Sequence, residues 1–312
     1  MGATQSMPEF KEVDVSDYID EVEAADVGYN LALVRGVPQN PLFDVAMFED
    51  LIDKFETRND DVFICTYVKA GTTWCQQIVT LLLNDGEQGD LSYGEQVPWL
   101  EALCAPDTLA HREAPGHSRA IIDATEGPRY FKSHATVADL PRGAAPGVRI
   151  VAVARNPKDT VVSLFHHASS KPEFGYTGDF ETFLRIFLTG HAENGSWFKH
   201  AVEWHQYSIR HPQHCLWLTY EQMIADHRGA VVQIAKFLGK PTRGPTIDRT
   251  VANSTMKSMK SNKKANIGLN HLRRGGIGGW RDYFTVSQSN CFDAAKLAGH
   301  GLRFNFGEGE EF

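Results

Sequence analysis

Short apolar runs rich in β-branched residues alternate along the chain with longer stretches that suit helices. The apolar runs have no internal breaker, which is typical of strands buried on both faces of a sheet; they cover residues 62–65, 148–155 and 215–220. The helical stretches cover residues 46–55, 74–83, the segment after Pro157, 180–190, 197–210 and 230–238. This alternation predicts an α/β fold with a parallel central sheet flanked by helices.

The remaining segments are shorter or less regular. Residues 31–38 look like a strand ended by Pro38, and residues 129–134 look like a short strand that leads into a loop. Residues 84–118 are punctuated by glycine and proline, so we expect an irregular segment of the kind that often shapes a substrate mouth. Residues 1–30 are acidic with few large apolar side chains and are interpreted as an N-terminal arm. No linker divides the rest, so residues 31–312 are expected to form a single domain.

Composition excludes several classes of protein. A hydrophobic content of 42% suits a globular domain with a core, and a net charge of −8 argues against a general nucleic-acid binder. Five cysteines without a Cys-x-x-Cys pair suggest neither a disulfide framework nor a zinc site, so we expect a reducing, cytoplasmic location. No leader and no apolar run of membrane-spanning length is present, so stable membrane insertion is not expected. The first six residues fit the N-myristoylation pattern at Gly2, and a single acyl chain would give only reversible membrane contact.

The stretch from Asp61 to Val79 predicts an anion site. A strand turns through Lys69, Ala70 and Gly71 into a helix that has no breaker before Asn84. The first amides of a helix have no intrahelical partner and the helix dipole adds positive potential there, so this turn should hold a phosphate. It is not a Walker A loop, because its lysine precedes the glycine. A glycine turn with a chance lysine beside it is the plain alternative.

Three further segments carry candidate chemistry. Arg155 ends a strand and Ser163 lies eight residues later, and a guanidinium offers a planar fork of donors that matches phosphate oxygens. Residues 272–285 place two adjacent arginines before a run of glycines, which lets backbone and guanidinium groups close over a phosphate. His134 follows a strand two residues after Lys132. Each segment also has a plain alternative. These are a surface arginine for Arg155, a basic glycine loop for residues 272–285, and an ordinary histidine, one of 13 in the chain, for His134.

These segments together resemble the cytosolic sulfotransferases from about residue 33 to residue 304. The family's phosphosulfate loop usually reads Thr-Tyr-Pro-Lys-Ser-Gly-Thr-Thr-Trp, and this chain departs from it at Val68 and Ala70. Residues 272–285 resemble the family's third signature, Arg-Lys-Gly-x-x-Gly-Asp-Trp-Lys-x-x-Phe-Thr, with Arg274 where the family has Lys and Gly279 where it has Asp. The resemblance implies a P-loop-like sulfotransferase fold and an enzyme that uses 3′-phosphoadenosine 5′-phosphosulfate (PAPS) as sulfuryl donor and releases 3′-phosphoadenosine 5′-phosphate (PAP).

The resemblance also implies roles for individual residues. His134 would be the general base of an in-line transfer, because an imidazole titrates near neutral pH, with Lys69 and Lys132 stabilising the developing charge. The implied nucleotide-binding residues are Lys69, Ala70, Gly71, Thr72, Thr73, Trp74, Arg155, Ser163, Tyr220, Ser254, Thr255, Met256, Arg273, Arg274 and Gly275. Arg155, Ser163 and the third signature would hold the 3′-phosphate. Tyr220 would contact the adenine, and Met256 stands where the family has a stacking Phe, so a thioether would replace one ring contact. No metal is implied.

The acceptor and the oligomeric state are less constrained. The acceptor is expected to be a small phenol, steroid or other alcohol, or an amine, in an apolar pocket lined by Trp99, Phe165, Phe174 and Tyr176. His166 and His167 are interpreted as helix surface or pocket wall. In the family's dimer motif this chain has Arg281, Thr285-Val286 and Asn290, with its end charges altered, so a monomer or weak homodimer is expected.

Three alternatives remain open at this point. A P-loop-type nucleotide kinase shares the strand, loop and helix, although the chain lacks a Walker lysine and a clear Mg²⁺ carboxylate. A non-catalytic nucleotide-binding module on the same fold is the second. The third is an enzyme that sulfonates an alcohol only to eliminate it, giving net dehydration.

Overall fold

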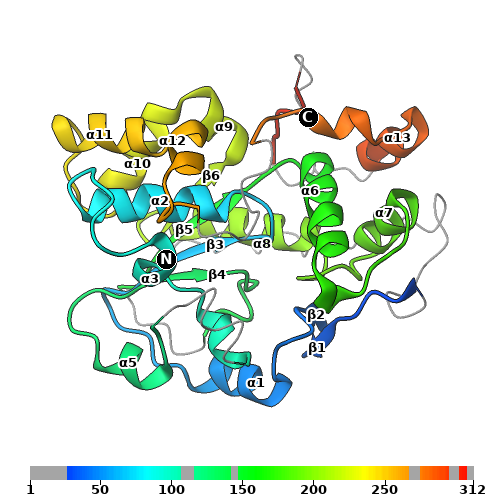
Figure 1. Ribbon diagram of the computed structural model, residues 1–312, viewed down its shortest axis with the longest axis horizontal. Helices are drawn as coiled ribbons and strands as arrows, with labels where there is room; N and C mark the ends of the chain where they lie inside the picture. Colours follow the sequence, from blue (N-terminus) through cyan, green and yellow to red (C-terminus); the bar gives the residue numbers. More distant parts are fainter. Residues whose placement is uncertain (1–26, 107–115, 142–146, 267–274, 295–301, 308–312) are drawn as a thin grey trace, which may run out of the picture.

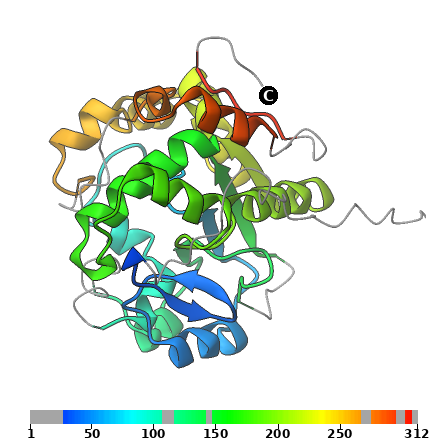
Figure 2. The same cartoon turned by 90° about the vertical axis from the view of Figure 1, so that its right-hand side faces the viewer.

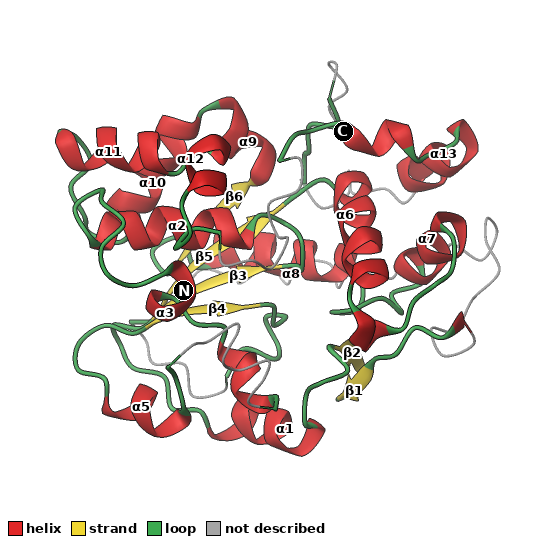
Figure 3. Ribbon diagram, in the orientation of Figure 1, coloured by secondary structure: helices red, strands yellow, loops and turns green. Residues whose placement is uncertain are grey.

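A parallel four-stranded sheet forms the centre of the molecule (Figure 3). The computed structural model describes residues 27–106, 116–141, 147–266, 275–294 and 302–307. The strands are β3 (Val62–Thr66), β4 (Tyr130–Ser133), β5 (Arg149–Ala154) and β6 (Cys215–Thr219), in the order β4-β3-β5-β6. All three strand pairs are parallel, so all four strands end at the same edge of the sheet. The predicted α/β fold with a parallel central sheet is confirmed.

Helices cover both faces of this sheet. They are α1 (Val45–Lys54), α2 (Thr72–Leu83), α3 (Tyr93–Gln96), η2 (Leu100–Cys104), α5 (Arg119–Ala124), α6 (Pro157–Ser170), η3 (Pro172–Phe174), α7 (Phe180–Leu188), α8 (Trp197–Arg210), α9 (Tyr220–Ala225), α10 (His227–Phe237), α11 (Pro245–Asn253), α12 (Met256–Ser261), η4 (Gly279–Asp282) and α13 (Val286–Ala294). Figure 1 shows α2, α10 and α11 above the sheet and α1 below it. None of the helices in the described ranges is long and apolar enough to cross a membrane.

The strand β3 shows why the sheet is covered on both sides. Its side chains alternate in direction, so Val62 and Ile64 pack with residues of α2 and α10. Phe63 and Cys65 pack with residues of α1 and α8 on the opposite face. All four side chains are fully buried. The unbroken apolar run in the sequence is therefore the pattern of a central parallel strand.

The prediction of one strand over residues 31–38 is wrong. These residues form a hairpin of β1 (Ala32–Val34) and β2 (Val37–Gln39), which pair antiparallel (Figure 2). Arg35 and Gly36 make the turn with φ angles of 52° and 78°. Positive φ at both central residues is the conformation that two-residue hairpins favour. Pro38 lies inside β2 rather than ending a strand, which an edge strand tolerates.

The described part of the segment predicted to be irregular, residues 84–106, contains two short helices. It contains α3, which begins with a capping box of Ser92 and Glu95, and the short helix η2. Between them, the Pro98 carbonyl accepts a hydrogen bond from the Lys132 amide (2.8 Å), so Trp99 lies beside β4. This contact places η2 directly under the loop that follows β4.

Candidate active site

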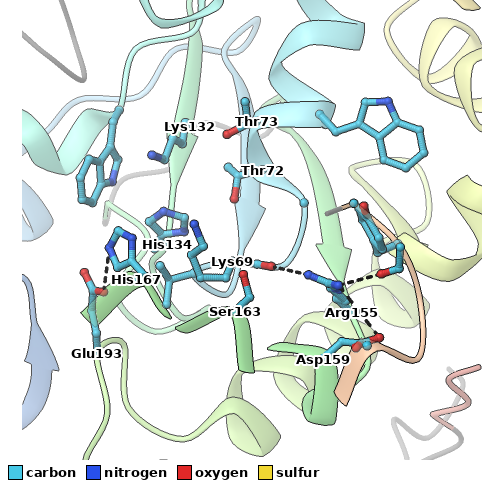
Figure 4. Close-up of a pocket in the computed structure, with 18 of the residues that line it drawn as sticks. Lys69, Thr72, Thr73, Lys132, His134, Arg155, Asp159, Ser163, His167 and Glu193 are labelled. Carbon is cyan, nitrogen blue, oxygen red and sulfur yellow. Dashed lines mark hydrogen bonds and ion pairs between the residues drawn. The ribbon is translucent and has the colours of Figure 1, made fainter. Parts of the chain in front are cut away.

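A cavity of about 260 Å³ lies at the edge of the sheet where the strands end. Of the residues proposed from the sequence, its lining includes Lys69, Gly71, Thr72, Thr73, Trp74, Lys132, His134, Arg155, Ser163, Tyr220, Met256 and Gly275. Figure 4 shows how seven of them lie around the cavity: Lys69, Thr72, Thr73, Lys132, His134, Arg155 and Ser163. Arg273, Arg274 and Gly2 lie outside the described residues. Within the described ranges, no three His, Cys, Asp or Glu side chains are placed to hold a metal ion.

The loop between β3 and α2 forms the floor of the cavity. Lys69 has a φ of 68°, which is uncommon for a residue with a side chain, and Gly71 has a φ of 105° as the N-cap of α2. A Cβ at Gly71 would lie 2.7 Å from the Tyr220 ring, so only glycine fits this turn. The hydroxyl of Thr72 is held by that of Thr66 at 2.6 Å. The loop thus presents first-turn amides of α2 toward the cavity, the arrangement that binds phosphate groups.

Ala70, the remaining proposed residue of this loop, has its side chain in the apolar core. Its side chain is fully buried and packs in the apolar cluster that includes Val161 and Phe187. It is not part of the cavity lining. Only its backbone is positioned by the turn, through a hydrogen bond from its amide to the Tyr67 carbonyl at 3.1 Å.

His134 has its tautomer fixed by the end of β3. Its Nδ1 lies 2.8 Å from the Thr66 carbonyl oxygen, which can only accept, so Nδ1 carries the proton. In the neutral ring the lone pair is then on Nε2. The ring is 5% exposed and packs edge-on against Trp99. The structure therefore gives a neutral His134 the form in which it accepts a proton at Nε2.

Glu101 of η2 holds the backbone at His134, a role for which no pattern in the sequence gives a signal. One carboxylate oxygen of Glu101 accepts from the Ser133 hydroxyl (2.5 Å) and from the His134 amide (3.0 Å). Burial raises the pKa of Glu101, while the hydrogen bond from Ser133 opposes this shift. Lys132 is fixed from the same side, with its Nζ 4.2 Å from the centre of the Trp99 ring.

Arg155 follows β5 and lies at the opposite end of the cavity from His134 (Figure 4). Its guanidinium donates to the Gly276 carbonyl at 2.9 Å and lies 4.7 Å from the centre of the Tyr220 ring. The Asp159 carboxylate is 4.0 Å away. Ser163 lies further along α6 and also lines the cavity. A guanidinium and a hydroxyl in this arrangement offer donors that suit an anion with several oxygens.

Asp159 connects α6 to the glycine-rich third signature, a link that sequence reasoning missed. Its two carboxylate oxygens accept from the Gly278 amide (2.8 Å) and the Trp280 amide (3.0 Å). A run of glycines has a high conformational entropy when free, so a buried acceptor is needed to fix it.

Trp74 and Tyr220 form the far wall beyond Arg155. Their ring centres are 5.4 Å apart, and Trp74 Nε1 donates to the Ser254 carbonyl at 2.8 Å. Met256 packs so closely on Gly275 that a Cβ there would lie 2.1 Å from the methionine methyl group. The two rings stand at 71° to each other, and with Met256 they make a mostly apolar slot against which a planar heterocycle can pack.

Ser254 and Thr255 support this wall without lining the cavity. Ser254 is fully buried and orients Trp74, while the Thr255 side chain caps α12. His227, not predicted from the sequence, packs on Trp74 with ring centres 5.1 Å apart and contacts the Ser254 hydroxyl at 2.9 Å. Burial lowers the pKa of His227, so its ring is neutral at pH 7.

Glu221 is a buried acid next to the anion end of the cavity. Its Oε1 accepts from the backbone amide of Asn156 at 3.0 Å and from the Asn156 side chain at 3.1 Å. Desolvation raises the pKa of Glu221 from 4.5 to about 7, against the opposing effects of Asn156 and the Arg155 charge. Since Asn156 is the N-cap of α6, this acid stabilises the turn that carries Arg155.

We expect the Glu221→Gln variant to have a higher free energy of unfolding than the wild type at pH values at which Glu221 is ionised. The folded state holds the Glu221 proton more tightly than the unfolded chain, so this contribution to stability is present below about pH 4.5 and is lost as pH rises through about 7. In urea unfolding at pH 8 the variant should exceed the wild type by up to roughly 3 kcal/mol, and the difference should vanish near pH 4.5. The exposed Glu126→Gln change is the control. An equal difference at both pH values would contradict the assignment.

The other end of the cavity, next to His134, differs from the apolar pocket expected from the sequence. Trp99 lines it, but Phe165, Phe174 and Tyr176 are not part of the lining. The rings of Phe174 and Tyr176 instead pack around Tyr29 in the core, and Phe165 packs against Tyr176. The lining instead contains the polar groups Asn40, His167, Lys171, Glu173 and Glu193, and Figure 4 shows His167 and Glu193 near His134. His166 contacts the Tyr283 hydroxyl at 2.6 Å, so of the two adjacent histidines His167 is the cavity residue.

Comparisons with known proteins agree with this geometry. The family model described as a sulfotransferase domain matches residues 59–296. Sulfotransferase 2B1 of Homo sapiens is 32% identical over 255 residues, which are 77% of this chain and 66% of that protein. Sulfotransferase 1A1 of Canis lupus familiaris is 33% identical over 294 residues, 88% of this chain and 95% of that one. Mouse sulfotransferase SULT7A1, solved with PAP, shares the fold with a TM-score of 0.71 at 24% identity, over 85% of this chain and 93% of that chain. The chain therefore belongs to the sulfotransferase family and is an enzyme of sulfuryl transfer.

Proposed function

We propose that this enzyme transfers the sulfuryl group of PAPS to a hydroxyl or amine of a small acceptor, with His134 as general base. The observation that carries the proposal is the fixed tautomer of His134 inside the same cavity as Lys69, Lys132 and the first turn of α2. Solved relatives are described in complex with PAP, among them the mouse sulfotransferase SULT7A1. The donor set of this cavity suits the same nucleotide.

The nucleotide fits the chemistry of the lining. Arg155 and Ser163 offer donors for the 3′-phosphate, and the third signature, Arg273, Arg274 and Gly275, would complete this end of the site. The slot between Trp74, Tyr220 and Met256 suits the adenine. The amides of the loop and Lys69 suit the 5′-phosphosulfate. A 3′-phosphate is thus the feature that should distinguish the donor from ATP.

The reaction is a single displacement at sulfur. Nε2 of His134 takes the acceptor proton, an acceptor oxygen–sulfur bond forms, and the bond from sulfur to the 5′-phosphate oxygen breaks. The electron pair leaves with PAP, so negative charge grows on that phosphate oxygen. Lys69, Lys132 and the amides at the start of α2 stabilise this charge. His134 is rigid for this role, because Thr66, Glu101 and Trp99 hold its ring and backbone.

Thermal stability with added nucleotides tests the donor site. PAP, AMP and ATP are compared at equal concentration, because a ligand that binds only the folded state raises the melting temperature in step with its affinity. We expect PAP to raise it most, since only PAP carries the 3′-phosphate for Arg155. A preference for ATP, with a Mg²⁺ requirement for turnover, would overturn the proposal in favour of a nucleotide kinase.

Turnover separates the remaining alternatives. PAP binding without sulfonation of any acceptor would indicate a non-catalytic nucleotide-binding module. Formation of an alkene and free sulfate from an alcohol would indicate net dehydration. The proposal places the activity in one domain over residues 31–312, since the described lining residues run from Asn40 to Gly279.

The proposal also includes a monomer or weak homodimer. Arg281, which stands at the first position of the family's dimer motif, is used within the chain. Its guanidinium donates to the carbonyls of Phe306 (2.9 Å) and Gly307 (3.1 Å). These bonds support a role for Arg281 in closing the C-terminal segment over the third signature.

A further inference from the structure

His227, the first residue of α10, contacts the adenine slot from outside the cavity. Its ring packs on Trp74 of α2, with ring centres 5.1 Å apart and an angle of 51° between the rings. Trp74 lines the cavity, whereas His227 is not part of the lining. Tyr220, a lining residue, contacts the same indole with ring centres 5.4 Å apart. The indole thus has two ring contacts, one from a residue of the cavity and one from a residue outside it.

Hydrogen bonds fix the orientation of the His227 ring. Its Nε2 lies 2.9 Å from the Ser254 hydroxyl, and that hydroxyl donates to the Thr250 carbonyl at 2.6 Å. A hydroxyl has one proton to donate and a carbonyl can only accept, so the Ser254 oxygen must accept from His227. Nε2 therefore carries the proton of the neutral ring. The imidazole is anchored in this way to the C-terminal end of α11.

Ser254 connects His227 to two members of the adenine slot. Its carbonyl accepts from Trp74 Nε1 at 2.8 Å, so the residue that anchors His227 also holds the edge of the indole. Ser254 is the C-cap of α11, and α12 begins two residues later at Met256, which lines the cavity. Figure 1 shows α2, α10, α11 and α12 on the same side of the sheet. His227 is thus placed to act on Trp74 and on the turn that leads to Met256.

An ion pair between Arg228 and Asp248 also joins α10 to α11, with a nitrogen–oxygen distance of 2.7 Å. Its two side chains are 55% and 60% exposed, and exposed pairs contribute little to stability because water and salt screen them. The hydrogen bond of the half-buried His227 is less screened, and its ring adds a direct contact with the indole. His227 is therefore the stronger of these two links to the slot.

We propose that His227 is a positioning residue for the base of the sulfuryl donor, an inference that rests on the proposed function. It holds the Trp74 indole and the start of α12 at the spacing that a planar base requires, and it does not contact the nucleotide itself. Contacts with the base contribute to the affinity of every adenine nucleotide, with or without a 3′-phosphate. His227 and Arg155 therefore act on different parts of the same ligand.

Calorimetric titration of the His227→Ala variant with three ligands tests the proposal. PAP and AMP both carry adenine, whereas ribose 3,5-bisphosphate carries the phosphates of PAP without the base. We expect the affinities for PAP and AMP to fall by the same factor, about three- to tenfold, because a ring contact and a hydrogen bond are lost. The affinity for ribose 3,5-bisphosphate should stay within about twofold of the wild type. Equal weakening of all three ligands would indicate a general structural fault and overturn the proposal.

His211 provides a matched control histidine. It packs on Tyr207 with ring centres 4.5 Å apart, and neither residue is part of the cavity lining. The His211→Ala variant loses the same type of side chain from an aromatic contact, so its affinity for PAP should equal that of the wild type. A loss of PAP affinity as large as that of His227→Ala would show that the effect does not depend on Trp74 and would overturn the proposal.

The His227→Gln variant keeps the proposal falsifiable if His227→Ala does not fold. Its amide still has a donor for the Ser254 hydroxyl, but it has no ring to pack on Trp74. The selective loss of affinity for PAP and AMP should persist, and wild-type affinity for both would overturn the proposal. A wild type that PAP does not stabilise would refute the donor site itself. Binding of PAP that is independent of His227 would overturn only this inference, so the two failures are distinguishable.

Discussion

Replacing His134 with alanine is expected to reduce kcat by about 10²–10⁴-fold, the range over which a positioned general base contributes. The variant lacks the Nε2 atom that would take the acceptor proton. Nucleotide binding should stay close to the wild-type level, because Arg155 and the adenine slot lie at the other end of the cavity. Steady-state turnover and the PAP-induced change in melting temperature check the two halves of this expectation.

The His134→Asn variant is the matched control for structure. Its side-chain amide can still donate to the Thr66 carbonyl, as Nδ1 does in the wild type, but it offers no basic nitrogen. If His134 acts as base, both variants lose turnover to a similar extent. If the His134→Asn variant retained activity within tenfold of the wild type, the side chain would be needed for its hydrogen bond to Thr66 and not for proton transfer.

Much of the fold could be predicted because its central strands are buried on both faces. The apolar runs at 62–65 and 148–155 contain the two inner strands β3 and β5, whose side chains are almost all buried, so pattern and structure agree. The run at 215–220 is the edge strand β6, which ends at Thr219 and is only partly buried. The hairpin of β1 and β2 was missed because its turn uses Arg35 with Gly36, not the Asn-Gly or Asp-Gly pair that marks such turns. A residue with a side chain at positive φ leaves no clear signal in the sequence.

The donor end of the cavity was predictable for a different reason. Its groups lie close together in the sequence. Lys69 to Trp74 form the loop and the first turn of α2, and Arg155 and Ser163 belong to one strand–helix unit. Glu101 and Asp159 were missed because each contacts a segment distant in sequence. Glu101 contacts His134 across 33 positions, and Asp159 contacts Trp280 across 121 positions. Only the folded chain brings such partners together.

At the His134 end of the cavity, aromatic residues proposed from the sequence do not line the cavity. Phe174 and Tyr176 were expected to line an apolar pocket, but they are buried around Tyr29. Large aromatic rings gain more from a core than from a cavity wall, since each buries a large apolar area. Polar side chains from three separate segments then line the cavity. Composition alone does not show which aromatic residues face a ligand.

Replacing Arg155 with alanine is expected to weaken PAP binding by about 10- to 100-fold, the range for loss of charge-assisted hydrogen bonds. The guanidinium is held by the Gly276 carbonyl and the Tyr220 ring in a position to meet the 3′-phosphate. Its removal also leaves the Asp159 carboxylate, 4.0 Å from it in the wild type, facing the same phosphate without its cation. Calorimetric titration with PAP measures the effect.

AMP distinguishes phosphate recognition from a general structural role of Arg155. AMP has no 3′-phosphate, so its affinity should change by less than about threefold while that of PAP falls, and the preference for PAP over AMP should largely disappear. The exposed Arg243→Ala change is the control for the loss of one positive charge and should leave both affinities unchanged. If Arg155 only organises the glycine-rich loop through Gly276, both nucleotides would weaken together. That result would assign the 3′-phosphate contact to other residues of the site. A direct contact by Arg155 must affect PAP, which carries the 3′-phosphate, more than AMP, which lacks it.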